Sequence, residues 1–282
     1  MHSSLLVPRR DDTLYRREFS LNFIAGGLRL RLAETDEERF AAQRLRYRVF
    51  FGEMGATPTA AAERHQMDVD KYDDIADHLI VTDIAGSDSG EYVVGTYRLI
   101  RRGPAMRCGG FYSAHEFDIA PLLRRPGEIL ELGRSCVDRD YRTLRVIDLL
   151  WQGVAAYISH YNVQILFGCA SFPTVKPNAL SLELSYLHHY CRADEAIRPV
   201  ALPGRCVEMN RVSVDAIDRK QGFMAMPPLL KGYLRLGGVV GDGAVVDYDF
   251  GTTDVCILVE RGGRMERYVE RYMARSRALK AS

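Results

Sequence analysis

Two oppositely charged side chains, Glu131 and Arg134, lie three positions apart on one short apolar segment of the chain. A glutamate carboxylate can accept a proton from a reacting amine, and an arginine can bind an anion through paired hydrogen bonds. Directly downstream, residues 138–143 form a polar turn that opens a helical pattern. The free N–H groups and the dipole of a helix start favour an anion, typically a phosphate. An acid–base candidate, an anion clamp and a phosphate-sized site therefore fall close together.

Other charged residues could bind a polar, zwitterionic acceptor. Arginine suits a carboxylate because its planar group donates two parallel hydrogen bonds. The candidates for that contact, which the pattern does not rank, are Arg46, Arg48, Arg98 and Arg134. Asp70 and Asp73 could bind an ammonium group, and a solvated acidic loop explains these two residues equally well.

The end of the same strand and the start of the helix offer groups for a donor. Backbone N–H groups on the strand that holds Ser135 and Cys136 are the expected donors to an oxyanion. Arg142 and Arg145 could contact a donor phosphate or an acidic protein, or could simply be exposed charges at a helix start. Cys136 is expected to be a buried thiol rather than a nucleophile, because no histidine is near it in sequence.

Hydrophobic periodicity predicts the elements that must position these side chains. Residues 129–137 form a strand, and an apolar stripe at helical spacing follows at Val146, Leu149, Leu150, Val154 and Ile158. Further strands are predicted at residues 28–33, 78–83, 91–100 and 163–170 and on both sides of Gly251. Helices are predicted after a cap at Thr35 or Asp36, at residues 178–190 with Asn178 as the cap, and from Met265 onward. This order predicts an α/β or α+β fold, a mixed sheet with helices on both faces.

The chain divides into a main domain and two shorter segments. The main domain is predicted at residues 28–260, after a loosely ordered arm at residues 1–27 and before a basic helical tail at residues 261–282. Residues 84–90 are predicted to contain a hairpin turn. The first helix is expected to turn Phe40, Leu45, Val49 and Phe50 toward the core.

Composition excludes several classes of protein. The 282 residues carry 38 Lys and Arg against 37 Asp and Glu, so a globally basic nucleic-acid binder is excluded. Neither a signal peptide nor an apolar run of about 20 residues is recognised. The 6 cysteines are not paired as C-x-x-C and the 7 histidines lack ligand spacing, so we expect no metal site. Reduced, mostly buried thiols in a cytoplasmic protein are expected.

Several short motifs, taken in order, resemble the GNAT acyltransferase fold, in particular its acyl-homoserine-lactone synthases. The segments that carry the resemblance are RYRVF (46–50), DVDKYDD with Asp70 and Asp73, GTYRL with Arg98, and ELGR with Glu131 and Arg134. Longer segments are similar to the ornithine N-acyltransferases of ornithine-lipid synthesis, and they extend into a C-terminal region that the lactone synthases lack in this form. These segments are FYSAHEFD, ELGRSCV, LLWQG, FGCASF, LHHYCRA, PPLLKGYLRLGG and VGDGAVVDYDFGTTDV.

The resemblance implies a reaction and roles for the residues. It implies transfer of a 3-hydroxyacyl chain from acyl carrier protein to the α-amine of L-ornithine, giving lyso-ornithine lipid, without a permanently bound cofactor. Glu131 and Arg134 would then be catalytic, and Arg46, Arg48, Asp70, Asp73 and Arg98 would bind the acceptor. Ser135, Cys136, Val137, Arg142 and Arg145 would bind the carrier's acyl-phosphopantetheine. A lipid product implies peripheral contact with the inner face of the membrane.

The turn before the helix departs from the usual GNAT pattern. Ordinary GNAT enzymes have the glycine-rich turn R/Q-x-x-G-x-G/A, which lets backbone N–H groups approach the pyrophosphate of coenzyme A. Arg145 and Ile147 stand here where small residues would be. These side chains block a close approach to a pyrophosphate and still allow contact with a single phosphodiester. The sequence therefore favours a carrier-protein donor over acyl-coenzyme A.

Other functions remain open at this point. A lactone synthase would use S-adenosylmethionine, and a related enzyme could acylate another amino acid such as glycine. From a different class, the chain could be a non-catalytic module that binds a carrier protein, or a membrane-active protein. Residues 227–240 are apolar enough to touch a membrane, although core packing explains them as well.

Overall fold

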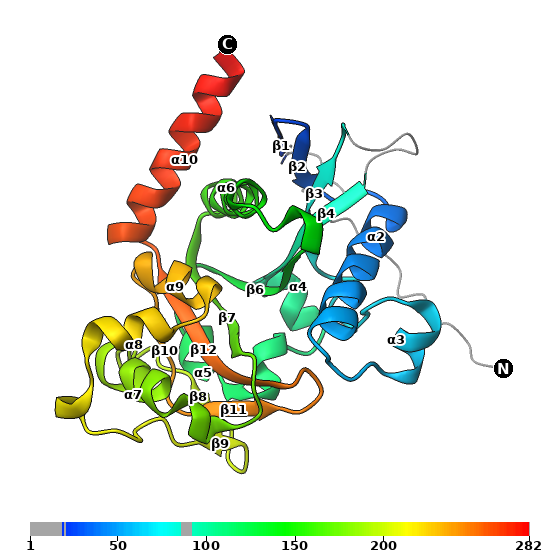
Figure 1. The fold of residues 1–282 in the computed structure, drawn as a ribbon. Coiled ribbons are helices and arrows are strands. Elements are labelled where there is room, and N and C mark those ends of the chain that lie inside the picture. Colours follow the sequence, from blue (N-terminus) through cyan, green and yellow to red (C-terminus); the bar gives the residue numbers. More distant parts are fainter. Residues whose placement is uncertain (1–18, 20, 86–91, 282) are drawn as a thin grey trace.

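A single large sheet organises the computed structural model, which describes residues 19, 21–85 and 92–281 (Figure 1). Its strand order is β1-β2-β3-β4-β6-β7-β12-β11-β9, with β10 also paired to β12. The strands are β1 (Asn22–Ala25), β2 (Leu28–Leu32), β3 (Asp77–Asp83), β4 (Tyr92–Arg101), β6 (Glu128–Val137), β7 (Val163–Phe172), β9 (Cys206–Val207), β10 (Val239–Val240), β11 (Ala244–Asp247) and β12 (Thr252–Glu260). The neighbours β6 and β7 are parallel, and the other described pairs are antiparallel.

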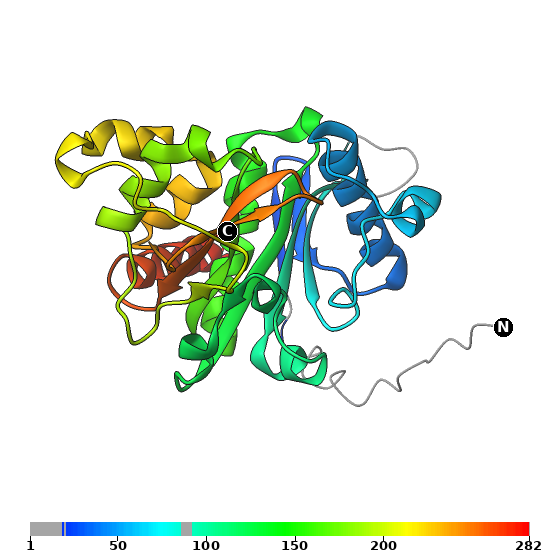
Figure 2. The ribbon, with the colours of Figure 1, turned by 90° about the horizontal axis from the view of Figure 1, so that it is seen from below.

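Helices cover both faces of the sheet, and short strands β5 (Phe117–Asp118) and β8 (Val200–Ala201) pair separately. The helices are α2 (Asp36–Tyr47), α3 (Ala60–His65), α4 (Arg102–Arg107), α5 (Ala120–Leu123), α6 (Leu144–Tyr161), α7 (Ser181–Tyr190), α8 (Arg219–Ala225), α9 (Pro228–Arg235) and α10 (Gly263–Ala281). A π-helical turn, η1 (Arg48–Glu53), extends α2. A 3-10 turn, η2 (Tyr112–His115), precedes β5. Figures 1 and 2 show α2 and α6 on opposite sides of the sheet, as the order of elements predicts.

Alternation along the strands explains this two-sided arrangement. Leu79 and Val81 pack into the cluster that contains the buried face of α6. Ile80, between them, packs against Leu45 of α2. Successive side chains of a strand point to opposite faces, so β3 buries both faces and reads as a continuous apolar run.

Local signals in the sequence fix the two main helices. Thr35 caps α2, accepting from the backbone N–H of Glu38, whose side chain accepts from the N–H of Thr35 in return. The predicted stripe of α6 is buried along its whole length, from Val146 to Ile158. The strand, turn and helix predicted around Glu131 are therefore confirmed.

The two parallel strands separate halfway along their length. Their pairing runs from Glu128 opposite Val163 to Glu131 opposite Phe167. One residue further on, a Cβ on Gly168 would lie 2.3 Å from the carbonyl oxygen of Leu132. Beyond this close approach the two strands share no described ladder pairs, so the second half of β6 leaves an unpaired edge facing β7.

A β-bulge lies in β6 at the point where the strands part. Thr96 and Arg98 of β4 are two positions apart, whereas their partners, Cys136 and Gly133, are three apart. Arg134 is one of the residues of the bulge, and its φ of 51° is uncommon for a residue other than glycine. The bulge turns Glu131 and Cys136 to the same face of the sheet, because their partners Ile100 and Thr96 share a face of β4.

Several expectations from the sequence are wrong in detail. Residues 22–25, assigned to a loose arm, form β1. Phe40 is exposed, because it lies on the outer side of α2. Asn178 does not cap α7, and its side chain accepts from Arg211 instead. Of the cysteines, Cys136 and Cys256 alone are classed as buried among the described residues. The predicted turn at residues 86–90 lies outside the described residues.

Candidate active site

A cavity of about 510 Å³ occupies the gap between β6 and β7. Its size falls in the usual range of small-molecule sites, about 300–1,000 Å³. The second half of β6 and the facing part of β7 both line it, together with η1, α9 and the β11–β12 hairpin. The predicted residues that line it are Arg98, Glu131, Arg134, Ser135, Cys136, Val137 and Arg142. The splayed strands thus bring the predicted acid–base and donor residues to one cavity.

The lining combines apolar and charged side chains. The apolar group comes from η1, α9 and β12 and consists of Val49, Phe50, Leu229, Leu230, Tyr233 and Ile257. The acidic group consists of Glu131, Asp247 and Asp254. A cavity of this kind can hold an acyl chain and a charged amine at the same time.

Glu131 is buried and tightly hydrogen-bonded. Its Oε2 accepts from the backbone N–H of Tyr112 at 2.9 Å. Its Oε1 accepts from the N–H and the Oγ of Ser113, at 2.6 and 2.5 Å. Burial raises the pKa of Glu131, against the opposing effect of the Ser113 hydrogen bonds. A carboxylate in this setting is oriented and is a better proton acceptor than one in water.

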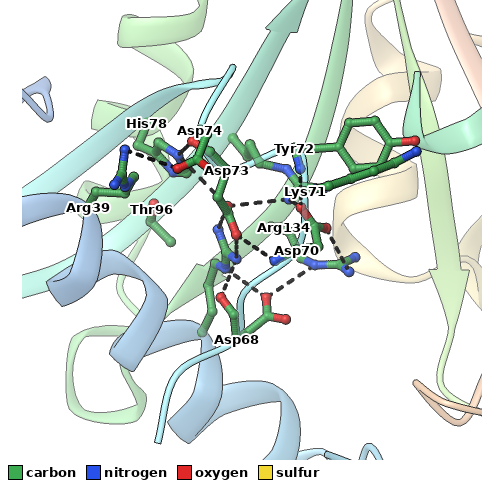
Figure 3. Close-up of polar contacts among 12 residues, drawn as sticks. Arg39, Asp68, Asp70, Lys71, Tyr72, Asp73, Asp74, His78, Thr96 and Arg134 are labelled. Carbon is green, nitrogen blue, oxygen red and sulfur yellow. Dashed lines mark hydrogen bonds and ion pairs between the residues drawn. The ribbon is translucent and has the colours of Figure 1, made fainter. Parts of the chain in front are cut away.

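Three arginines and three aspartates form a buried ionic network beside the cavity (Figure 3). Arg46 is fully buried and lies 2.8 Å from Asp68 and 2.7 Å from Asp73. In Figure 3 the loop that carries the aspartates lies against Arg134. The remaining ion pairs join Arg98 to Asp70 (2.6 Å) and Asp73 (3.4 Å), and Arg134 to Asp68 (3.2 Å) and Asp70 (3.5 Å). Each of these charges is thus matched by an opposite one.

The predicted acceptor-binding residues are distributed differently from the expectation. Among the described residues Arg46, Arg48, Asp70, Asp73 and Arg98, Arg98 alone lines the cavity. Arg134, the other candidate for the acceptor carboxylate, lines it as well. Arg46, Asp70 and Asp73 are joined to one another through the network and do not line it. Arg48 is exposed and contacts Tyr92 and Asp138. Direct substrate contact by these four residues stays a prediction, and their observed partners are protein groups.

The network sets the protonation of its members. Burial would raise the pKa of Asp73, but Arg46 and Arg98 hold it well below its usual range. Burial lowers the pKa of His78 to about 4, although Asp73 opposes that shift. His78 is therefore neutral near pH 7, and its Nε2 lies 3.0 Å from the carbonyl oxygen of Asp73.

Arg134 connects the network to the cavity. Its guanidinium lies 4.7 Å from the ring centre of Tyr112 and 4.4 Å from that of Phe250. Arginine between two aromatic rings loses hydration but keeps its charge. Arg134 therefore combines a left-handed backbone conformation with a side chain that is held by two aspartates and two aromatic rings.

A second acidic group lies on the β7 and β12 side of the cavity. One carboxylate oxygen each from Glu116 and Asp254 and the sulfur of Cys169 lie within 4.8 Å of one another. Burial raises the pKa values of Glu116 and Asp254, and Asp254 adds to the shift of Glu116. Sequence reasoning missed Asp68, Tyr112, Ser113, Glu116 and Asp254. The polar-aromatic run FYSAHEFD was the available signal for three of them.

The remaining polar groups on the cavity are neutral hydroxyls and thiols. The hydroxyls of Tyr97 and Tyr233 lie 2.5 Å apart, and burial raises the pKa of Tyr97 to about 12. Burial raises the pKa of Cys136 to about 12 as well. It raises that of Cys169 well above its usual value. These high pKa values disfavour a thiolate nucleophile at either cysteine.

Arg142 and Arg145, near the start of α6, lie in different surroundings. Arg142 lines the cavity and bonds to Glu53 at 2.5 Å. Arg145 does not line the cavity, and its guanidinium packs on Gly26 in the β1–β2 turn. Leu144 is 86% exposed and Ile147 42% exposed. An exposed patch with apolar and basic residues therefore surrounds the start of this helix.

The apolar segment at residues 227–240 belongs largely to the core. Leu230, Tyr233 and Leu234 of α9 are buried, whereas Leu229 is exposed beside the cavity. No helix in the described part of the chain is long and apolar enough to cross a membrane.

The chain is similar in sequence to named proteins over most of its length. Residues 45–152 match the model of the acetyltransferase (GNAT) domain. The chain is 46% identical over 274 residues to an L-ornithine N(alpha)-acyltransferase of Agrobacterium fabrum, covering 96% of this chain and 93% of the relative. It is 47% identical to a protein of the same name from Brucella abortus, covering 88% of this chain and 90% of the relative. A solved N-acyl amino acid synthase from uncultured soil microbes shares 12% identity, covering 86% of this chain and 92% of that one, with a TM-score of 0.48.

Proposed function

Because the chain belongs to the L-ornithine N(alpha)-acyltransferase family, we propose that it transfers a 3-hydroxyacyl chain from acyl carrier protein to the α-amine of L-ornithine. The product is lyso-ornithine lipid, the first intermediate of ornithine-lipid synthesis. The observation that carries the proposal is one cavity that joins an apolar lining to buried carboxylates. Such a site suits an acyl chain and a cationic amino acid together.

The reaction forms an amide bond and breaks a thioester. The neutral α-amine attacks the thioester carbonyl carbon, the C–N bond forms, and the C–S bond breaks as the carrier thiolate leaves. Glu131 accepts the amine proton, directly or through a water molecule. Tyr97 lines the cavity as a protonated hydroxyl and donates its proton to the sulfur. The proton taken up by Glu131 passes through water to Tyr97, so amide and free thiol are the products and both side chains return to their starting protonation states.

The unpaired edge of β6 provides the oxyanion site in this proposal. Ser135, Cys136 and Val137 line the cavity on the stretch where β6 has no ladder partner in β7. Backbone N–H groups at such an edge are free to donate to the developing charge on the carbonyl oxygen. Arg134 and Arg98 hold the acceptor carboxylate, and Arg46, Asp70 and Asp73 keep these two arginines in place.

The donor is bound at the start of α6 in this proposal. Arg142 contacts the phosphodiester of the phosphopantetheine at the cavity, and Arg139 and Arg145 contact the acidic carrier protein. Exposure of Leu144 and Ile147 beside these charges supports a protein-docking surface. We expect the R139E/R145E variant to raise the KM for acyl carrier protein about tenfold, mostly at low salt. Arg124→Glu, at the opposite end of β6, is the control, and an equal effect there would contradict the docking surface.

The function itself is tested with purified protein. Wild type is incubated with 3-hydroxyacyl carrier protein and L-ornithine, and the product is identified by mass spectrometry. A mono-acylated ornithine with the acyl group on the α-nitrogen is the expected product. Equal rates with 3-hydroxyacyl-coenzyme A would remove the carrier-protein assignment, and acylation of glycine in preference to ornithine would remove the acceptor assignment.

Release of a lipid product suggests peripheral contact with the inner membrane face. Leu229, exposed next to the cavity, is the group that we propose to touch lipid. Co-sedimentation with anionic vesicles is expected for wild type and reduced for Leu229→Ser. No sedimentation of wild type would contradict the contact and leave the acyltransferase proposal unaffected.

A further inference from the structure

The Glu116–Cys169–Asp254 group, here called the acidic site, has no role in the chemistry described above. Its members come from three separate places, the end of η2, the middle of β7 and the start of β12. Cys169 and Asp254 line the cavity, and Glu116 lies behind Cys169 with its Oε2 3.4 Å from the sulfur. The fold therefore brings two carboxylates together at the wall of the reaction cavity.

One carboxylate oxygen of this site is buried without a partner. Asp254 is 5% exposed, and its Oδ1 has no hydrogen-bond partner in the described structure. A buried carboxylate oxygen without a partner is costly, so it marks a place where a donor is missing. Cys169 offers a weak S–H donor to Glu116, which does not neutralise either carboxylate.

The charged groups around the acidic site do not neutralise it. Arg205 donates to the carbonyl oxygen of His115, and Arg134 is paired with Asp68 and Asp70. Asp247, a third carboxylate on the cavity, accepts from the N–H groups of Asp249 and Phe250. Within the residues that the structure describes, neither Glu116 nor Asp254 forms an ion pair with a basic side chain.

We infer that Glu116 and Asp254 bind the distal ammonium group of a diamino acid acceptor. The inference rests on the proposed function and adds to it the part of the cavity that selects the acceptor's side chain. An alkylammonium group donates three hydrogen bonds. The two carboxylates can accept two of them, and the free Oδ1 of Asp254 is the acceptor that lacks a donor.

The spacing to Glu131 agrees with such an acceptor. Ser113 Oγ lies 2.5 Å from Glu131 Oε1 and 3.5 Å from Cys169 Sγ, so one hydroxyl separates the proton acceptor from the acidic site. The two nitrogens of ornithine are separated by four carbons, on the order of 6 Å when the chain is extended. An α-amine near Glu131 and a distal ammonium at the acidic site are therefore compatible.

An ammonium ion suits this donor set better than a metal ion does. Cys169 would have to lose its proton to bind zinc, and burial and the neighbouring Glu116 and Asp254 raise its pKa and oppose that loss. Magnesium or calcium would have to draw most of its ligands from water, because the site supplies two carboxylates. The positive charge of an ammonium group needs only acceptors arranged on one side.

The test compares L-ornithine with L-norvaline, which has the same carbon chain and no distal amine. For wild type, kcat/KM for ornithine should exceed that for norvaline by about 100-fold. Asp254→Asn and Glu116→Gln should each lower kcat/KM for ornithine about tenfold or more and leave the norvaline rate nearly unchanged. Asp249→Asn, an equal change of charge on the exposed turn of the same β11–β12 hairpin, should alter neither.

Calorimetric titration with ornithine gives a readout that is independent of turnover. In buffers of different ionisation enthalpy, wild type at pH 7 should release protons on binding ornithine, and Glu116→Gln should release fewer. Equal losses with both acceptors in the variants would overturn the inference. Loss of wild-type activity on chelation, restored by a divalent cation, would also overturn it. Failure of wild type to acylate any amino acid would instead remove the proposed function.

Discussion

Two groups of buried carboxylates lie near the same cavity, and they differ in how their charge is matched. In the first, Asp68, Asp70 and Asp73 each contact arginines of the ionic network. In the second, Glu116 and Asp254 lie beside each other, a thiol and the hydroxyls of Thr252 and Ser171, which carry no positive charge. In the first group, arginines of the protein compensate the negative charges. In the second group, the carboxylates can ionise at a low free-energy cost only when a cation binds from outside the protein.

The difference has a measurable consequence, because the pKa of Asp73 shifts in the opposite direction from the pKa values of Glu116 and Asp254. The pKa of Asp73 is lowered, so its contribution to stability is present above the pKa of the unfolded chain and is lost in acid. The pKa values of Glu116 and Asp254 are raised, so folding is favoured when they are protonated, and stability falls as pH rises through these values. Asp73 thus stabilises the fold at neutral pH, whereas ionised Glu116 and Asp254 oppose folding in the absence of a bound cation.

The largest effect is expected from breaking the ionic network. Arg46→Met leaves Asp68 and Asp73 buried without their closest cation, and we expect a loss of about 3–5 kcal/mol in the free energy of unfolding. Urea unfolding at pH 7 measures it. Arg48→Met, which removes an exposed pair with Asp138, should cost less than about 1 kcal/mol. Similar losses for both would show that Arg46 has no special structural role.

Removing the proton acceptor should lower turnover, and it should also lower the free energy of unfolding, because both oxygens of Glu131 accept backbone N–H groups. Glu131→Gln keeps the shape of the side chain but cannot take up the amine proton, so kcat/KM for ornithine should fall about 100-fold or more. Glu128→Gln, on the same strand and outside the cavity lining, is the control. A fully active, folded Glu131→Gln protein would leave Glu131 as a purely structural clamp on Ser113.

Acid should weaken the network through His78. Its pKa is near 6.5 in the unfolded chain and about 4 in the folded one, so the unfolded chain binds more protons between these values. The free energy of unfolding should therefore fall by about 2–3 kcal/mol as pH drops from 6.5 to 4. His78→Gln should reduce this slope, and the exposed His65→Gln should not. Identical slopes in the two variants would assign the acid sensitivity elsewhere.

The smallest effect is expected in the second group of carboxylates. Glu116→Gln removes a carboxylate that is costly to ionise, so at pH 8 the variant should be more stable than wild type by about 1 kcal/mol. At pH 5, where the carboxyl group is protonated, the difference should shrink. Thermal unfolding at both pH values measures this change, and a variant less stable at pH 8 than at pH 5, relative to wild type, would contradict it.

Sequence patterns predicted the scaffold of this site better than its contacts. The strand with Glu131, the stripe of α6 and the GNAT-like mixed sheet follow from periodicity and motif order, which local residues determine. Periodicity could not show that Arg46 pairs with Asp73, because that contact joins residues 27 positions apart. It also could not place Asp254 beside Glu116, since strand pairing across the sheet decides which side chains meet.

Sequence patterns could not predict the bulge in β6, for a different reason. A positive φ is usually signalled by glycine, and here the residue with φ of 51° is Arg134, while Gly133 precedes it. Alternation alone would have put Glu131 and Cys136 on opposite faces. The extra residue reverses the alternation, so both point to the same face, and both line the cavity in the gap between β6 and β7.

That bulge also limits how the chain can be recombined or shortened. A single-residue deletion at position 133 or 134 would restore regular pairing with β4 and would leave Cys136 opposite Thr96, so the two ends of the strand would keep their faces. The deletion would instead remove the irregular backbone that places the guanidinium of Arg134 between Tyr112 and Phe250. Chimaeras between relatives should therefore place their crossover points outside residues 131–137, so that both halves of the strand are inherited from one parent.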